Sequence, residues 1–200
     1  MNEKELEILQ QSAVLFMKYG LKSLSMDDLA RELKVSKKTL YKHFNDKESM
    51  ISLIMENFIA EEKESIDRIC KSSKNAIDEV LSINELLNEQ LKDLSSSIHF
   101  DMEKYYRKAW EIFNNYKFDF IFNCVVKNIE RGIEEGLYRD NIKPEIIAKI
   151  YVMRIDYIID GELFPQNEYS FVDVNDEVVK YHLGGLVNNK GLAYLKSKNL

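Results

Sequence analysis

Apolar residues recur at helical spacing from the first turn of the chain. Leu6, Leu9, Ala13 and Phe16 stand three or four positions apart, so they form one face of an amphipathic helix. Gly20 follows at the position of a helix C-cap. The pattern predicts a first helix that ends just before this glycine.

Two short helices are predicted next. Ser25, with an acid three residues later, has the form of a capping box and predicts a helix that begins after it. Ser36 is a favourable N-cap for a third helix, in which Leu40 and Phe44 make an apolar pair at i and i+4. Residues 1–46 are therefore expected to form three short helices joined by tight turns.

The rest of the chain keeps a helical pattern nearly to its end. Asp46 is placed to cap a fourth helix, which runs from Lys47 to about Cys70. Further helices are expected at about 75–97, 102–110, 117–135 and 144–160, then a loop at 162–173 and a last helix from about 174 to near Gly191. The pattern predicts an all-α fold.

The composition agrees with this fold. Seven glycines and two prolines are few for a turn-rich all-β architecture. Cys70 and Cys124 have no CxxC spacing, so neither a disulfide framework nor a structural zinc site is expected. No apolar run approaches the ~18 residues of a membrane span, and the N-terminus does not have the pattern of a signal peptide. We expect a reduced, cytoplasmic protein with no metal and no cofactor.

The charge is unevenly distributed along the chain. The net charge is -6, but residues 1–47 hold nine Lys or Arg against seven Asp or Glu. Between Lys34 and Lys47 there are five lysines and one acid. An anionic partner responds to charge within a Debye length of about 8 Å, so this stretch is compatible with nucleic-acid binding despite the acidic total.

The stretch SMDDLARELKVSKKTLYKHFNDK, residues 25–47, predicts a helix-turn-helix motif. On a helical wheel Leu40 and Phe44 lie about 40° apart and form a core face. The other face is basic and aromatic and carries Lys38, Tyr41 and Lys42, with Lys37 at its border. Such a helix can bury one side and present the other to a major groove.

The first turn of this helix carries Lys37 and Lys38, where the helix dipole favours anions. Two lysines there are unfavourable for an isolated helix. They are favourable if an external phosphate binds at this helix end and supplies the anion. The alternative is that these lysines form a solvated face and that Tyr41 is ordinary rim packing. The residues alone leave both interpretations open.

The first fifty residues resemble the N-terminal DNA-binding domain of the tetracycline-repressor (TetR) family. The segments that carry the resemblance are ILQQSAVLFMKYG, LSMDDLARELKVSKKTLYKHF and NDKESMI. Two positions depart from the family pattern: Lys34, where glycine is frequent in the turn, and Lys38, where glycine or alanine is common. Lys34 must therefore adopt the backbone that the turn demands, at a modest cost if φ is positive. Lys38 is expected to alter the operator preference.

The resemblance implies that residues 1–46 form a homeodomain-like helix-turn-helix domain that binds double-stranded DNA. It implies DNA contacts by Ser25, Met26, Ser36, Lys37, Lys38, Thr39, Tyr41, Lys42, His43 and Lys47. Lys37 and Lys38 are best placed for base edges, whereas Tyr41, His43 and Lys47 would contact the backbone.

The resemblance also implies that residues 47–200 form a helical effector-binding and dimerisation domain. Expected dimer contacts, each of which could instead be core within one chain, are Tyr151, Ile155, Ile158, Val179, His182, Leu183 and Leu186. Expected contacts to an unknown small-molecule effector, with the same alternative for the aromatics, are Trp110, Phe113, Phe122 and Arg154. Arg154 could also pair with an acid of its own helix or of a partner subunit.

The expected function is a homodimeric, sequence-specific transcriptional regulator, a repressor that an effector releases from a palindromic operator. The sequence contains no HExxH, GxSxG, GxxxxGK[ST] or GxGxxG motif, so it is not expected to be an enzyme. The other function considered is a protein-binding adaptor, which would use the aromatic stretch near Trp110 and leave the lysine face idle.

Overall fold

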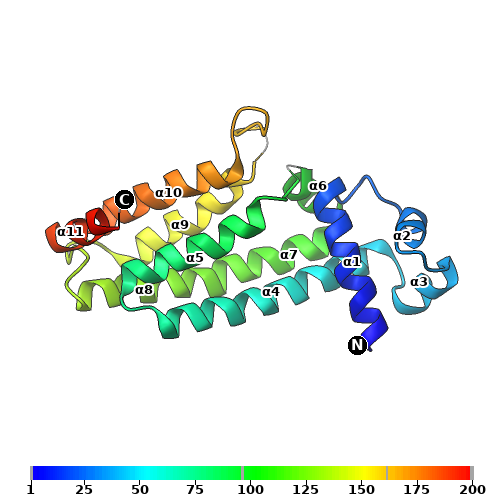
Figure 1. The fold of residues 1–200 in the computed structure, drawn as a ribbon, viewed down its shortest axis with the longest axis horizontal. Coiled ribbons are helices and arrows are strands. Elements are labelled where there is room, and N and C mark those ends of the chain that lie inside the picture. Colours follow the sequence, from blue (N-terminus) through cyan, green and yellow to red (C-terminus); the bar gives the residue numbers. More distant parts are fainter. Residues whose placement is uncertain (1, 96, 161, 199–200) are drawn as a thin grey trace. The chain divides into compact units, whose positions relative to one another are not determined.

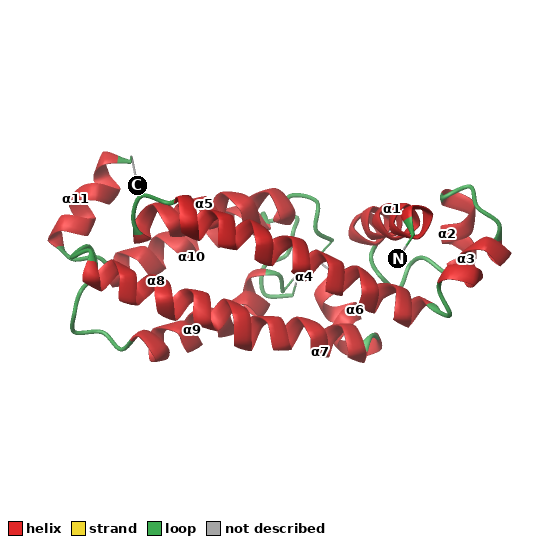
Figure 2. Ribbon diagram, turned by 90° about the horizontal axis from the view of Figure 1, so that it is seen from below, coloured by secondary structure: helices red, strands yellow, loops and turns green. Residues whose placement is uncertain are grey.

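The computed structural model describes residues 2–95, 97–160 and 162–198, and the named elements in these ranges are all helices (Figures 1 and 2). In chain order they are α1 (Glu3–Tyr19), α2 (Met26–Glu32), α3 (Lys37–His43), α4 (Lys47–Ser72), α5 (Ala76–Leu91), α6 (Ser97–Tyr105), α7 (Arg107–Asn115), the π-helix η1 (Tyr116–Ile121), α8 (Phe122–Glu134), α9 (Pro144–Ile158), α10 (Phe171–Leu186) and α11 (Asn189–Ser197). The all-α prediction is confirmed. No helix in these ranges is long and apolar enough to cross a membrane.

The chain forms two compact units. The first comprises Met1–Glu62 and Asp93–Asn115, and the second comprises Lys63–Lys92 and Tyr116–Leu200. Helix α4 begins in the first unit and ends in the second. The units therefore do not coincide with the boundary expected between residues 46 and 47, because α6 and α7 belong with the N-terminal helices.

The local signals in the first unit act as the sequence predicts. Ser25 and Asp28 form a reciprocal capping box at the start of α2, and Ser36 caps α3. Gly20 ends α1 with a positive φ of 83°. Lys34, in the turn between α2 and α3, has a φ of 55°, so this lysine holds a left-handed backbone that favours glycine.

The core of the first unit joins α1, α2 and α3 to the start of α4. Leu40 is fully buried and Phe44 is 1% exposed, which confirms them as the core pair of α3. They pack in one cluster with Phe16 of α1, Leu29 of α2 and Met50 of α4. A helix of seven residues gains little from its own hydrogen bonds, so this burial fixes the position of α3.

The second unit is a helical bundle in which α5 packs against α10 and α8 packs against α9 (Figure 2). A polar network ties α5 to α8: Arg131 donates to Glu79 at 2.7 Å, and Asn128 donates to the other oxygen of Glu79 at 2.9 Å. The hydroxyl of Tyr138 donates to Asn128. The buried carboxylate of Glu79 is thereby paired and hydrogen-bonded.

Several expected helices were placed wrongly. The helix expected at 102–110 is two helices, α6 and α7, which meet at Tyr106. The single last helix expected from about 174 is broken after Leu186, because the side chain of Asn188 accepts hydrogen bonds from the backbone of Lys190 and Gly191 and caps α11. The helix expected at 75–97 ends at Leu91.

Candidate nucleic-acid interface

Helix α3 divides its side chains between two faces. Leu40 lies in the core, as described, while Lys37, Lys38, Tyr41 and Lys42 are exposed. Tyr41 keeps 49% of its surface accessible although it is a large aromatic residue. The structure therefore gives one exposed surface that combines three ammonium groups with one phenol.

The hydroxyls at the start of α3 are partly used by the cap. Ser36 Oγ accepts from the backbone N–H of Thr39 at 3.0 Å, and the two hydroxyl oxygens lie 2.7 Å apart. His43 lies at the other end of α3, half-buried, with its ring centroid 6.3 Å from that of Phe44. Ser36, Thr39 and His43 therefore lie at the edge of the exposed lysine surface.

Helix α2 supplies the neighbouring edge. The Ser25 hydroxyl donates to Asp28 at 2.6 Å, and the hydrogen bonds from Ser25 hold the pKa of Asp28 below its usual value. Met26 was expected to lie near DNA, but its side chain is 7% exposed and belongs to the hydrophobic core. Its thioether is therefore a packing group, and the expected position of Met26 near a phosphate stays a prediction.

Lys47, the first residue of α4, is held between aromatic rings. Its ammonium lies 5.5 Å from the ring centroid of Phe16 and 5.5 Å from that of Tyr106, in the range of cation–π contacts. Partial burial lowers the pKa of Lys47. This ammonium is more confined than the lysines of α3.

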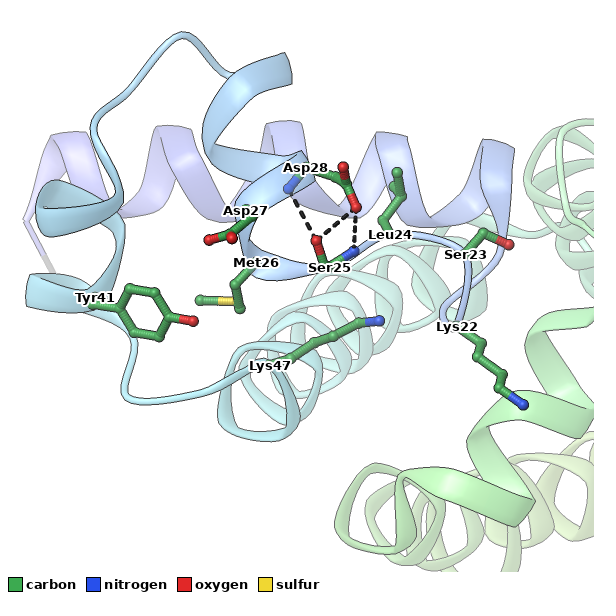
Figure 3. A pocket seen from close by; sticks show the side chains of 9 residues that line it. All are labelled: Lys22, Ser23, Leu24, Ser25, Met26, Asp27, Asp28, Tyr41 and Lys47. Carbon is green, nitrogen blue, oxygen red and sulfur yellow. Dashed lines mark hydrogen bonds between the residues drawn. The ribbon is translucent and has the colours of Figure 1, made fainter.

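An open hollow of about 500 Å³ lies beside α2 (Figure 3). Its lining consists of Lys22, Ser23, Leu24, Ser25, Met26, Asp27, Asp28, Tyr41 and Lys47. Two lysines and a tyrosine therefore share one concave surface with the carboxylates of Asp27 and Asp28. The ammonium and phenol groups are donors for a phosphate, which the carboxylates oppose. The sequence analysis missed Lys22, which lies outside the predicted motif.

An ion pair links the two helices of the motif. The ammonium of Lys37 lies 2.5 Å from a carboxylate oxygen of Asp27 on α2. Both side chains are more than half exposed, at 63% and 54%. The sequence analysis missed Asp27, because no periodicity within one helix reveals a pair between two helices.

Residues of α6 and the α6–α7 junction hold the loop between α1 and α2. Asp101, 6% exposed, accepts a hydrogen bond from the backbone N–H of Lys22 at 3.0 Å. The Lys22 ammonium donates to the hydroxyl of Tyr105, which raises the pKa of Lys22 and lowers that of Tyr105. Tyr106 donates to the carbonyl of Leu21 at 3.5 Å.

The four expected effector contacts fall in different units. Trp110 and Phe113, on α7, pack against the core of the first unit, where the Trp110 ring also meets His99 edge-on at 5.0 Å. Phe122 and Arg154 lie in the second unit, on α8 and α9. This packing favours the structural role that was the alternative interpretation of Trp110 and Phe113, and their contact with an effector stays a prediction.

The expected dimer contacts are mostly core within one chain. Four of them are only 1–6% exposed, so their apolar surface is already buried within one chain: Ile158, Val179, Leu183 and Leu186. Tyr151, Ile155 and His182 are partly buried, and the rings of Tyr151 and His182 lie 4.7 Å apart. The expectation fails for the four buried residues because α9 and α10 carry apolar residues on both inner and outer faces.

The exposed apolar residues of α9 are not among the expected dimer contacts. They are Ile146, Ile150, Met153 and Tyr157, which are 49–62% exposed and spaced four, three and four positions apart. Tyr181 on α10 is 85% exposed. The four residues of α9 are hereafter the outer apolar stripe.

The family model described as "Bacterial regulatory proteins, tetR family" matches residues 8–54, from α1 into α4. Residues 8–54 are therefore similar to the N-terminal domain of TetR-family regulators. The matched range contains the whole exposed lysine surface of α3 and both residues of the Lys37–Asp27 ion pair.

Proteins similar in sequence match over nearly the whole chain. An uncharacterised HTH-type transcriptional regulator of Bacillus subtilis, YvaF, is 24% identical over 90% of this chain and 93% of its own. The HTH-type transcriptional repressor KstR2 of Mycolicibacterium smegmatis is 21% identical over 92% and 91% of the two chains. The structure of the Bacillus subtilis regulator FadR in complex with stearoyl-CoA shares the fold, with a TM-score of 0.67 and 15% identity over 90% and 98%. These relatives are transcriptional regulators, and the match of residues 8–54 supports a DNA-binding regulator.

Proposed function

We propose that this chain is a homodimeric repressor of the TetR family, that it binds an inverted-repeat operator and that a small-molecule effector releases it. The observation that carries the proposal is the division of α3 into a buried face, with Leu40, and an exposed face of three lysines and Tyr41. Lysine ammonium groups donate to guanine O6 and N7 in the major groove, which an α-helix with one free face can enter. The name of the KstR2 relative supports repression.

Phosphate contacts would hold α3 in register. The hollow beside α2 places Lys22, Ser25 and Lys47 around one concave surface (Figure 3). A phosphate seated there would receive two ammonium groups, one of them already confined by the rings of Phe16 and Tyr106. Contacts of this type fix orientation and carry no sequence information of their own.

The outer apolar stripe supports the homodimer. Large exposed apolar residues at spacings of four and three are typical of a helix that packs against another helix. Gly184 and Gly185 of α10 are exposed and have open space around them, so a partner helix can approach closely. A two-fold interface would pair the same stripe on both subunits and match an inverted repeat.

Two features support release by an effector. The FadR structure with the same fold is a complex with stearoyl-CoA. In this chain, Arg154 Nε and Nη1 are buried without a hydrogen-bond acceptor among the described residues, and the guanidinium stacks on Tyr151 at 3.7 Å. Arg154 remains our candidate effector contact. A ligand that displaces α4, which runs through both units, would move the DNA-binding helices, with a typical coupling of about 1–3 kcal/mol.

Selection of bound duplexes from a random DNA pool at about 150 mM salt, near the physiological screening condition, tests the proposal. We expect enrichment of an inverted repeat with half-sites about one helical turn apart, or a multiple of it. Absence of any enriched sequence, or enrichment of a single half-site by a monomeric protein, would contradict it.

A further inference from the structure

The ion pair between Asp27 and Lys37 places an acid within the surface that is proposed to meet DNA. Lys37 is in the first turn of α3, and its ammonium lies 2.5 Å from Asp27 Oδ2. Asp27 also lines the hollow that contains Tyr41 and Lys47 (Figure 3). A carboxylate at this position repels phosphates, so it opposes the sequence-independent part of DNA binding.

Stability does not explain the pair. Asp27 is 54% exposed and Lys37 is 63% exposed, and ion pairs that are this accessible contribute little to folding. The first turn of α2 favours an acid, but Asp28 already fills the capping box there. The effect that remains is on Lys37: the carboxylate holds the flexible ammonium at the edge of α2 and leaves two of its three donors for a ligand.

The pair presents a donor beside an acceptor. In the major groove a G·C pair presents the reverse pattern, with the O6 and N7 acceptors of guanine beside the N4 amino donor of cytosine. We propose that Asp27 is a specificity-determining residue that reads one G·C pair in each half-site together with Lys37. Lys37 donates to the guanine, and Asp27 accepts from the cytosine amino group. This inference rests on the proposed function, because it requires α3 to lie in the major groove.

The test compares DNA selections by the wild-type protein, Asp27→Asn and Glu32→Gln. Asp27→Asn keeps the size of the side chain and removes its charge. Glu32→Gln removes one acid from the exposed C-terminal end of the same helix and serves as the control for charge alone. We expect one G·C position to lose about tenfold in preference in Asp27→Asn and to be unchanged in Glu32→Gln.

Two further measurements sharpen the result. On a random duplex, Asp27→Asn should bind more tightly and its salt slope should steepen by up to about 1, because Lys37 is then free to pair with a phosphate. On the selected duplex, replacing the cytosine by 2-pyrimidinone, which has no N4 amino group, should weaken the wild-type protein about tenfold and leave Asp27→Asn unaffected.

The outcomes separate this inference from the proposed function. If the wild-type protein enriches no sequence, both fail. If it enriches an inverted repeat but Asp27→Asn selects the same bases, the inference is overturned and the proposed function stands. Retention of the G·C preference by Lys37→Met would also overturn it, because Lys37 would not be the residue that reads the guanine.

Discussion

The carboxylate of Asp101 accepts a 3.0 Å hydrogen bond from the backbone N–H of Lys22, 79 residues earlier in the chain. Asp101 belongs to α6, and Lys22 lies in the loop that leads from α1 to the start of α2. This contact joins a helix outside the predicted DNA-binding motif to the loop that borders the hollow proposed to hold a phosphate. Movement of α6 would therefore be transmitted to the DNA-binding surface.

Asp101→Ala should weaken both stability and DNA binding. The substitution leaves the Lys22 N–H without its acceptor, at a cost of about 1–3 kcal/mol in the free energy of unfolding. Urea unfolding measures this loss, and operator titration measures the accompanying drop in affinity. Asp101→Asn keeps an acceptor oxygen and should lose less. Equal losses for both variants would show that the hydrogen bond is not the cause.

Lys34→Gly should stabilise the protein. Lys34 has a φ of 55°, a conformation that costs a residue with a side chain about 1–2 kcal/mol and costs glycine almost nothing. The greater freedom of glycine in the unfolded chain offsets part of this gain and leaves about 0.5–1 kcal/mol. Thermal and urea unfolding measure the difference. A decrease in stability would show that the side chain of Lys34 stabilises the fold by more than its positive φ destabilises it.

Ile150→Asp should dissociate the proposed dimer. Ile150 is 62% exposed at the centre of the outer apolar stripe, so a carboxylate there would be buried in the interface without a partner. Sedimentation equilibrium should show a shift from dimer to monomer at micromolar concentration. Val14→Asp on α1, where the valine is 66% exposed, is the matched control and should leave the dimer intact. A dimeric Ile150→Asp protein would place the interface elsewhere.

His182 should make the stability fall at acid pH. Burial, together with the charge of Arg154, lowers the pKa of His182 from 6.5 to about 3. Below pH 6.5 the unfolded chain therefore binds a proton that the folded chain excludes. Stability is full above pH 6.5 and decreases as the pH falls toward 3. At pH 5 the free energy of unfolding is lower by up to about 2 kcal/mol.

His182→Gln should remove that dependence. The free energy of unfolding, measured in urea at pH 7.5 and pH 5 at one protein concentration, should fall less in the variant than in the wild-type protein. Other groups contribute equally to both proteins, so the difference reports His182. An identical fall in both would contradict the lowered pKa.

The sequence predicted α1, α2 and α3 well because their signals are local. Capping residues such as Ser25 and Ser36 act within one turn. Lys34 stands where glycine is frequent, and the structure shows that its φ is positive, as a glycine position would allow. The buried pair Leu40 and Phe44 follows from spacing alone. These features depend on neighbours within four residues, which periodicity and capping preferences describe.

The second unit was predicted less well because its helices are apolar on more than one face. In α9, Ile158 is buried and Ile150 is exposed, yet both belong to an apolar run in which spacing does not separate core from surface. Contacts between elements, such as the ion pair of Asp27 and Lys37, could not be predicted either. Such pairs depend on how two helices pack, which no pattern along one helix encodes.

The most direct test of the account is equilibrium binding of Lys38→Ala to the selected inverted repeat and to a scrambled duplex at the same salt concentration. Lys38 is exposed on α3, and Lys127, exposed on α8, supplies the matched control Lys127→Ala. The account predicts that Lys38→Ala loses about tenfold or more of the preference for the selected duplex, while Lys127→Ala keeps it. Unchanged preference in Lys38→Ala would contradict the claim that this face of α3 reads DNA.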